Sequence, residues 1–246
     1  MEPLLADFLL VLTYALLPAI GNLIGAALAE SLHSPRWVIG AALHGAAGIA
    51  IALAAVDLMP RILDAIPMWV IVLAFLLGAG FSLLLWYGVR ALRGPFGRTR
   101  RKALMVYVVI GADLFSDGLM TGAGSAVASG LGLLIGATQT IANIPGGFAA
   151  TKNLQGNKVP RGRRWLLSFF LFLPVMTSAA IGFWLLGGQG DFVQNAALAF
   201  IVGVLLLATI EDMIPEGDRP QPARWISTLS FAAGFAGLSL AATYLQ

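Results

Sequence analysis

The sequence predicts an all-α, polytopic membrane protein with eight transmembrane helices, and three observations support this fold class. Of the 246 residues, 59% are hydrophobic and only 11% are charged, whereas soluble domains carry roughly 25% charged residues. The apolar residues form long uninterrupted runs, which excludes a water-soluble globule, a disordered chain, a collagen and a coiled coil. The chain has no cysteine, so neither a disulfide framework nor a thiolate metal site is expected.

Eight apolar runs are long enough to cross the hydrocarbon core, which takes about 20 helical residues. Charged residues, proline or glycine clusters close each run. The first run has Glu2 and Asp7 but no basic residue before its apolar part, so we expect a span and not a cleaved signal peptide. We therefore expect a single transmembrane domain over 1–246, with no soluble domain. Its spans are approximately 7–30, 37–59, 68–91, 103–128, 130–152, 164–187, 192–214 and 224–245.

The basic residues favour one face of the membrane. Fourteen of the 15 lysines and arginines follow odd-numbered spans, and Arg61 is the exception. The positive-inside rule then places the basic loops in the cytoplasm and both termini outside. We interpret the basic clusters as topology determinants that extend to lipid head groups. Because an odd number of spans would scramble this asymmetry, the bias also supports the count of eight.

Spans 2 and 7 both finish on an Asp-apolar-apolar-Pro motif. Asp57–Pro60 reads Asp-Leu-Met-Pro, and Asp212–Pro215 reads Asp-Met-Ile-Pro. The two spans run in opposite directions, as expected for an inverted repeat of spans 1–3 and 6–8 around a central pair. Spans 4 and 5, joined near Ser129 and Gly130, form that pair as a tight antiparallel hairpin. Each carries polar residues followed by helix-breaking residues near mid-membrane, so we expect the two interrupted stretches to meet.

Two carboxylates lie deep in span 4. Asp113 is about 15 Å into the helix, and Asp117 lies one turn further on the same face. An aspartate at a helix centre costs roughly 2.5–3.5 kcal/mol on an insertion scale. The pair would repel if both were ionised, so either one is protonated or a cation lies between them. Gln139 and Asn143 in span 5 add neutral oxygen atoms at similar depth, and the four side chains form a candidate metal site.

Structural roles compete with the functional one at each position. Asn and Gln in membrane helices commonly join helices by hydrogen bonds, and a protonated, hydrogen-bonded pair is the alternative for the two aspartates. His44 in span 2 is either a ligand or a packing residue. Asp57, Glu211 and Asp212 lie at span ends near the head groups, where interface anchoring competes with a role at a vestibule or gate.

Together these motifs resemble those of the ZIP family of divalent-metal permeases. Span 4 of that family typically reads His-Asn-aromatic-Pro-Glu-Gly where this chain has Asp113–Gly118, and span 5 typically ends Asn/Asp-x-Pro-Glu-Gly where this chain has Asn143–Gly147. The ends of spans 2 and 7 are similar to the family's Asp-Leu-Leu-Pro-Glu and Asp-Glu-Leu-Ile-Pro-Glu. The resemblance implies eight spans in a 3+2+3 inverted-repeat arrangement, termini outside, and inward carriage of a divalent metal ion.

Several departures reduce the metal site that the resemblance implies. The family's span-4 His and Glu are Asp113 and the shorter Asp117, and its bridging span-5 Glu is Gly146, so a bridged two-metal centre is not expected. Span 6, around Thr177 and Ser178, lacks the acidic residue of many members, and the His-rich loop after span 3 is missing. One all-oxygen site remains. This ligand set disfavours zinc relative to manganese, iron(II) or magnesium, because imidazole ligation favours zinc.

The sequence therefore predicts a transporter of divalent metal ions such as Zn, Mn or Fe, with the ion as substrate and no permanently bound cofactor. A ZIP-like membrane protein that carries another solute or has a regulatory role is the alternative, which the loss of the glutamate at Gly146 favours. An intramembrane hydrolase using the two aspartates is a third class. Since the chain has no Ser-His pairing and no His-Glu-x-x-His motif, we expect no enzyme activity.

The expected surroundings follow from the same features. We expect the chain in a prokaryotic plasma membrane, with the lipid bilayer and the metal ion as partners and a homodimer as a candidate assembly. The net charge of +3 is small and confined to loops, so no nucleic-acid partner is expected.

Overall fold

The computed structural model describes residues 2–32, 36–91, 98–219 and 221–245, and these residues form helices and the turns that connect them. The description covers the backbone alone at 2–4, 36, 85–86, 89–91, 98–109, 212 and 242–245. The predicted all-α fold is confirmed for the described ranges. The elements are α1 (Glu2–Ser31), α2 (Arg36–Ala52), the π-helix η1 (Leu53–Leu58), α3 (Met59–Leu63), α4 (Met68–Ala91), α5 (Arg98–Val127), α6 (Ser129–Gly156), α7 (Arg161–Phe170), α8 (Phe172–Leu186), α9 (Asp191–Ala208), the π-helix η2 (Thr209–Met213), α10 (Ile214–Asp218) and α11 (Arg224–Leu245).

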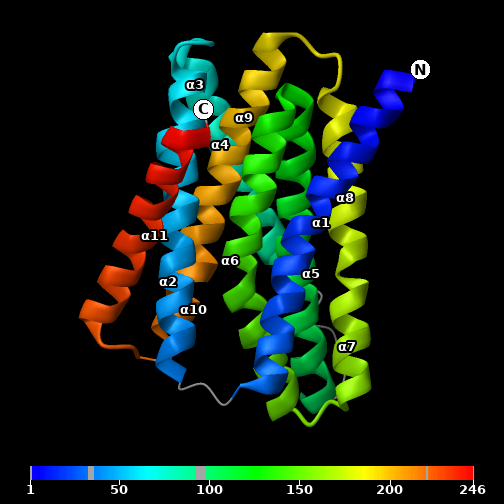
Figure 1. Cartoon of the computed structure of the whole chain (residues 1–246), viewed down its shortest axis with the longest axis vertical. Helices are drawn as coiled ribbons and strands as arrows, with labels where there is room; N and C mark the ends of the chain where they lie inside the picture. Colours follow the sequence, from blue (N-terminus) through cyan, green and yellow to red (C-terminus); the bar gives the residue numbers. More distant parts are fainter. Residues whose placement is uncertain (1, 33–35, 92–97, 220, 246) are drawn as a thin grey trace.

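Consecutive elements join into eight helical rods within the described part of the chain. One rod is α2, η1 and α3, another is α7 and α8, and a third is α9, η2 and α10, while α1, α4, α5, α6 and α11 are each a rod of their own. Both termini lie at the same end of the molecule, which we call the terminus end (Figure 1). The opposite end, where α6 leads into α7, is called the basic end for its residues Lys152, Lys158, Arg161 and Arg164.

The chain is an integral membrane protein. Large apolar side chains face outward, for example Leu77 and Leu84 on α4, which are 68% and 71% exposed. A continuous surface of this kind would drive association in water, whereas the hydrocarbon of a bilayer accommodates it. Four helical stretches among the described residues are long and apolar enough to cross a bilayer, namely Leu5–Ser31, Trp37–Leu63, Arg161–Leu186 and Asp191–Asp218.

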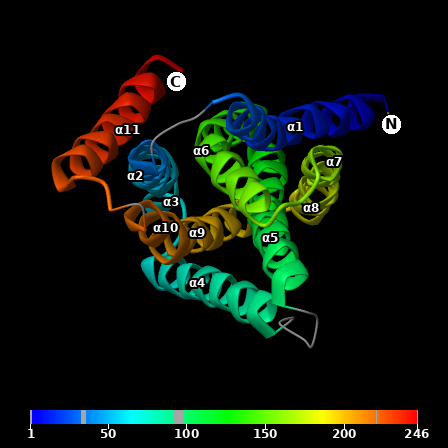
Figure 2. The same cartoon turned by 90° about the horizontal axis from the view of Figure 1, so that it is seen from below.

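The rods pack as two bundles (Figure 2). The hairpin bundle consists of α1, α5, α6, α7 and α8, and its most extensive contacts join α1 to α6 and α5 to α8. The outer bundle consists of the remaining elements, and there the most extensive contacts join α2 to α11 and α4 to α9. The bundles meet where α2 contacts α6 and α5 contacts α9. Buried side chains such as Leu53, Ile135 and Val202 form an apolar core between them.

Glycines let the paired rods approach to backbone contact. A Cβ atom at Gly78 of α4 would overlap the carbonyl oxygen of Phe200 on α9, and one at Gly122 of α5 would overlap that of Ala179 on α8. Small residues at helix contacts are the usual means of close packing between membrane helices. The same relation holds in the other two pairs, for Gly48 against Phe231 and for Gly21 against Thr140.

Both Asp-apolar-apolar-Pro motifs run through a turn of π-helix, and neither one ends its rod. The N–H of Met59 bonds to the carbonyl of Ala54, and the N–H of Ile214 bonds to that of Thr209, five residues back in each case. The short helices α3 and α10 then continue past the prolines. The prediction that the helices stop at these motifs is therefore wrong. Proline lacks an N–H and crowds the carbonyl four residues earlier, and a wider turn accommodates both effects.

The predicted hairpin is present, with a single residue, Ala128, between α5 and α6. The predicted interruptions within it are not, because Gly118, Pro145 and Gly147 all lie inside continuous helices. The glycines serve close packing instead of breaking the helix. A Cβ atom at Gly147 would overlap the backbone carbonyl of Asn22 on α1. Proline inside a membrane helix is tolerated where neighbouring groups satisfy the freed carbonyl.

Candidate metal site

Asp117 and Asn143 meet across the α5–α6 hairpin. The Nδ2 group of Asn143 donates a hydrogen bond of 2.6 Å to Oδ2 of Asp117 and one of 2.9 Å to the main-chain carbonyl of Gln139. Both residues are buried, with 4% of each exposed. Asp117 lies ten residues before the end of α5 at Val127, which is about 15 Å along the helix axis. The hairpin therefore holds a carboxylate deep in the bundle with a neutral amide as its bonded neighbour.

Asp113 places a second carboxylate beside the first. It lies one turn earlier on the same face of α5 and is partly buried. Two negative charges in a low-dielectric interior repel strongly. A cation held between the two carboxyl groups, or a proton on one of them, removes that repulsion.

Gln139 joins the site through its backbone, as the acceptor of the second Asn143 hydrogen bond. Its side chain is buried, and Nε2 has no hydrogen-bond partner among the described residues. An unbonded buried polar group costs about 1–3 kcal/mol. Rotation of the amide about its last torsion exchanges the oxygen and the nitrogen. This end of Gln139 is therefore free to respond to a ligand.

The space around Gly146, where the resemblance to the ZIP family leads one to expect a glutamate, is open. A Cβ atom at Gly146 would meet no heavy atom of the described residues within 4 Å, whereas one at the next residue, Gly147, would overlap α1. Across all the residues that the structure describes, no group of three or more His, Cys, Asp or Glu side chains is arranged to hold a metal ion. The acidic part of the site is thus the pair Asp113 and Asp117.

The other candidate residues lie in the outer bundle. His44 on α2 places Nδ1 2.8 Å from the carbonyl oxygen of Gly40 and Nε2 3.2 Å from Oδ1 of Asp218, at the end of α10. Asp57 in η1 is buried and accepts a 3.2 Å hydrogen bond from Arg61, so it is not the exposed interfacial group that the sequence suggests.

The π-helix η2 carries the other two candidates, Glu211 and Asp212. Glu211 is exposed, and the side chain of Asp212 lies outside the described part of the structure. None of the contacts described for these outer-bundle residues joins them to Asp117. The structure therefore brings Asp117 and Asn143 into contact, with Asp113 one turn away on α5 and the backbone of Gln139 bonded to Asn143, whereas the vestibule or gate candidates lie in the outer bundle.

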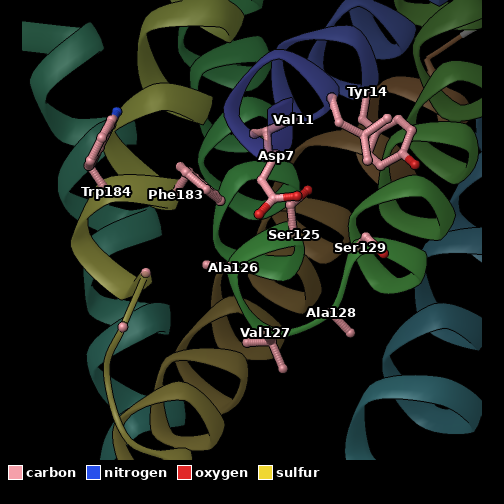
Figure 3. A pocket seen from close by; sticks show the side chains of 13 residues that line it. Asp7, Val11, Tyr14, Ser125, Ala126, Val127, Ala128, Ser129, Phe183 and Trp184 are labelled. Atoms are coloured by element: carbon pink, nitrogen blue, oxygen red, sulfur yellow. The ribbon is translucent and has the colours of Figure 1, made fainter. Parts of the chain in front are cut away.

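A cavity of about 530 Å³ opens at the terminus end of the hairpin bundle, between α1, the hairpin turn and α8 (Figure 3). Its polar lining comes from Asp7, Tyr14, Ser125 and Ser129. The remaining lining is mainly apolar and includes the ring of Phe183 (Figure 3). The cavity is thus large enough for a hydrated cation and carries one carboxylate.

Two hydroxyl residues, Thr121 and Ser125, form a row along α5 between Asp117 and this cavity. Thr121 donates from Oγ1 to the carbonyl of Asp117 at 2.8 Å, and Ser125 donates from Oγ to the carbonyl of Thr121 at 2.7 Å. Residues four apart share one helix face, so the carboxylate and the cavity lie on the same side of α5, about 12 Å apart along the axis. Neither this row nor a role for Asp7 at a cavity was predicted from the sequence. The four-residue spacing of Thr121 and Ser125 after Asp117 is a signal from which the row could have been predicted.

Comparison with known proteins provides no relative from which a role could be transferred. No protein-family model matches the chain, and no curated protein matches it significantly. Function is therefore inferred from the residues and from their geometry.

Proposed function

We propose that the protein is a membrane transporter for divalent metal ions, resembling the ZIP permeases, with a single oxygen-rich site between α5 and α6. The observation that carries this proposal is the buried carboxylate of Asp117, bonded across the hairpin to Asn143 at 2.6 Å, with Asp113 one turn away. Ionisable residues inside membrane helices typically mark an ion pathway. The ion is the substrate, no resident cofactor is needed, and no catalytic step is involved.

The ligand set favours a hard ion that is held weakly. The carboxylates of Asp113 and Asp117 and, once their amide groups rotate, the side-chain oxygens of Asn143 and Gln139 would supply oxygen only, which suits manganese or iron(II) better than zinc. Among the described residues no larger acidic or His cluster surrounds them. Conduction requires binding that is favourable enough for the ion to arrive and weak enough for it to leave.

We also propose that all eight rods cross the membrane as a 3+2+3 inverted repeat. Exchanging the first three rods with the last three, and α5 with α6, converts the α1–α6 pair into the α8–α5 pair and the α2–α11 pair into the α9–α4 pair. It also relates the π turn before Pro60 to the π turn before Pro215. A twofold pseudo-symmetry axis in the membrane plane accounts for both relations.

The proposed route begins at the cavity of the terminus end. We propose that the ion passes from there along the face of α5 that carries Ser125 and Thr121 to reach Asp117 and Asn143. The positive-inside rule makes the basic end cytoplasmic and the terminus end external, in a prokaryotic plasma membrane. Rocking of the outer rods, α1 and α7–α8 among them, against the central α5–α6 hairpin then exposes the site to the cytoplasm, as alternating access requires.

A ZIP-like protein that carries another solute, or that regulates a partner, is the second candidate. Gly146 favours it, because the family's bridging carboxylate is missing there and nothing in the described structure lies within 4 Å of the Cβ position. Metal-dependent uptake by the purified protein separates the two candidates.

The test is uptake of Mn²⁺, Fe²⁺ and Zn²⁺ into proteoliposomes containing the parent chain, Asp117→Asn or Asp191→Asn. Asp191 is an exposed aspartate at the start of α9 and serves as the matched control. We expect uptake by the parent and the control, and at least about a tenfold loss for Asp117→Asn, since one charged ligand contributes about 1.5–3 kcal/mol. Absence of uptake by the parent would refute metal transport, and equal uptake by all three would refute the central site.

A further inference from the structure

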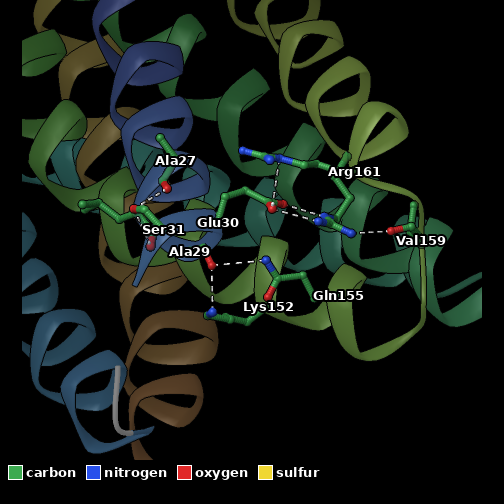
Figure 4. Close-up of polar contacts among 10 residues, drawn as sticks. Ala27, Ala29, Glu30, Ser31, Lys152, Gln155, Val159 and Arg161 are labelled. Carbon is green, nitrogen blue, oxygen red and sulfur yellow. Dashed lines mark hydrogen bonds and ion pairs between the residues drawn. The ribbon is translucent and has the colours of Figure 1, made fainter. Parts of the chain in front are cut away.

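A nearly buried ion pair joins α1 to α7 at the basic end (Figure 4). The guanidinium of Arg164 donates from Nε to Oε1 of Glu30 at 2.6 Å and from Nη2 to Oε2 at 2.8 Å. The side chains of Glu30 and Arg164 are only 9% and 13% exposed. Arg161 adds a longer contact to the same carboxylate at 3.7 Å. Such a bidentate Arg–carboxylate pair fixes the relative position of the two side chains more strongly than a single hydrogen bond.

The end of α1 is bound to α6 as well. Lys152 donates from Nζ to the carbonyls of Ala29 at 2.7 Å and Leu32 at 3.0 Å, and Gln155 donates to the carbonyl of Ala29 at 3.2 Å. Carbonyls at a helix C-terminus lack partners within the helix and carry negative partial charge, so a lysine there is favourable. We call the set Glu30, Lys152, Gln155, Arg161 and Arg164 the α1 latch.

The two ends of the hairpin bundle differ in how open they are. At the terminus end, α1 and α8 border the cavity of about 530 Å³. Towards the latch, a void between α1, α5, α6 and α7 holds only about 10 Å³ and is lined in part by Asn22, Thr151 and Ser168. A void of that size admits at most one water molecule. The hairpin bundle thus has a wide cavity towards the terminus end and a narrow void towards the basic end, where the latch lies.

We propose that the α1 latch is the gate that closes the basic end while the terminus end is open, so that breaking the Glu30–Arg164 pair shifts the protein to the opposite state. This proposal rests on the proposed function in so far as it assumes alternating access. The latch holds the ends of α1, α6 and α7 together, and these rods, with α5, line the narrow void at Asn22. Separation of α1 from α7 therefore widens that void.

The chain contains no cysteine, so a single introduced thiol reports accessibility without background. One reporter is Ser168→Cys, at a buried position of α7 that lines the small void, and the other is Ser125→Cys, in the large cavity. The protein is reconstituted in nanodiscs in metal-free buffer, and the rate of reaction with a charged thiol reagent is measured at each reporter. Each reporter is combined in turn with Glu30→Gln, Arg164→Gln, both together, or Arg163→Gln.

If the latch is a gate, Glu30→Gln and Arg164→Gln each raise the rate at the Ser168 reporter about tenfold and lower the rate at the Ser125 reporter. The double variant changes each rate by less than the sum of the two single changes, because both substitutions remove the Glu30–Arg164 pair. Arg163→Gln, an exposed arginine beside the latch, leaves both rates unchanged. A rise at both reporters shows general loosening of the fold and overturns the proposal, as does no change at either.

Because the labelling is done without metal, its outcome does not depend on whether the protein transports metal ions. Reciprocal labelling in a protein that takes up no metal would support the latch and overturn the metal as substrate. Unchanged labelling in a protein that does take up metal would overturn the latch and leave the proposed function standing.

Discussion

At the scale of single residues, Asp117 and Asp57 are both buried aspartates with different partners. Asp57 accepts from Arg61, whose side chain is 44% exposed, whereas the bonded neighbour of Asp117 is the neutral amide of Asn143. In Asp57→Asn the arginine can turn to water, so we expect less than about a threefold loss of uptake. In Asp117→Asn the ion loses a charged ligand, and we expect at least about a tenfold loss. Initial uptake rates in proteoliposomes measure both, and equal mild losses would count against a central site.

The open space at Gly146 gives a second residue-scale prediction. Because a side chain there meets no heavy atom of the described residues within 4 Å of Cβ, Gly146→Glu should fold. It adds a carboxylate close in sequence to Asn143, which is unfavourable near Asp113 and Asp117 without a cation and favourable with one. We expect the rise in melting temperature caused by manganese, zinc or cadmium to be at least about 2 °C larger than in the parent.

Thermal unfolding of the purified Gly146→Glu variant and the parent, each with and without metal, measures this difference. Gly147→Glu is the contrasting variant, since its side chain would collide with α1 at Asn22, and it should be destabilised whether or not metal is present. An equal metal shift in Gly146→Glu and in the parent means that Gly146 does not face the site. The candidate function without metal would then be strengthened.

At the scale of helices, close packing depends on which glycine faces the partner rod. Gly78 and Gly80 both lie on α4, but a Cβ atom would overlap the Phe200 carbonyl at Gly78 and meet nothing within 4 Å at Gly80 among the described residues. We expect Gly78→Ala to destabilise the protein by about 1–3 kcal/mol, as overpacking does. Gly80→Ala should be neutral or stabilising by up to about 1 kcal/mol, because alanine loses less backbone conformational entropy than glycine when the helix forms. Unfolding in detergent compares the two, and equal effects would contradict backbone contact between α4 and α9.

Much of this helical architecture could be predicted from the sequence, because apolar runs closed by charges are a strong signal. The hairpin and the approach of Asp117 to Asn143 were also predictable from the sequence. A very short connection requires the two helices that it joins to pack side by side. The path of the helix at Pro60 and Pro215 was not. A proline can end a helix or follow a π turn, and only the surrounding packing decides which.

At the scale of the whole molecule, pairing between distant segments is what the sequence could not provide. Glu30 and Arg164 are 134 positions apart, and nothing in a local pattern links them. From the sequence, Arg164 is expected to be one of several basic residues that determine topology. In the structure its side chain is nearly buried against Glu30 of α1. Glu30, at the end of the first apolar run, is the residue that could have indicated a partner. A carboxylate at a helix C-terminus is unfavourable unless a cation lies beside it.

The orientation of the whole molecule provides the last prediction. Lysines and arginines gather at one end, and loops rich in these residues stay in the cytoplasm. We therefore expect the terminus end to face the outside. Because the chain lacks cysteine, Gln189→Cys in the exposed turn between α8 and α9 and Lys158→Cys in the exposed turn between α6 and α7 report the two ends separately. In intact cells, a thiol reagent that cannot cross the membrane should label the first variant and spare the second until the membrane is permeabilised. The opposite pattern would invert the orientation and reverse the proposed direction of transport.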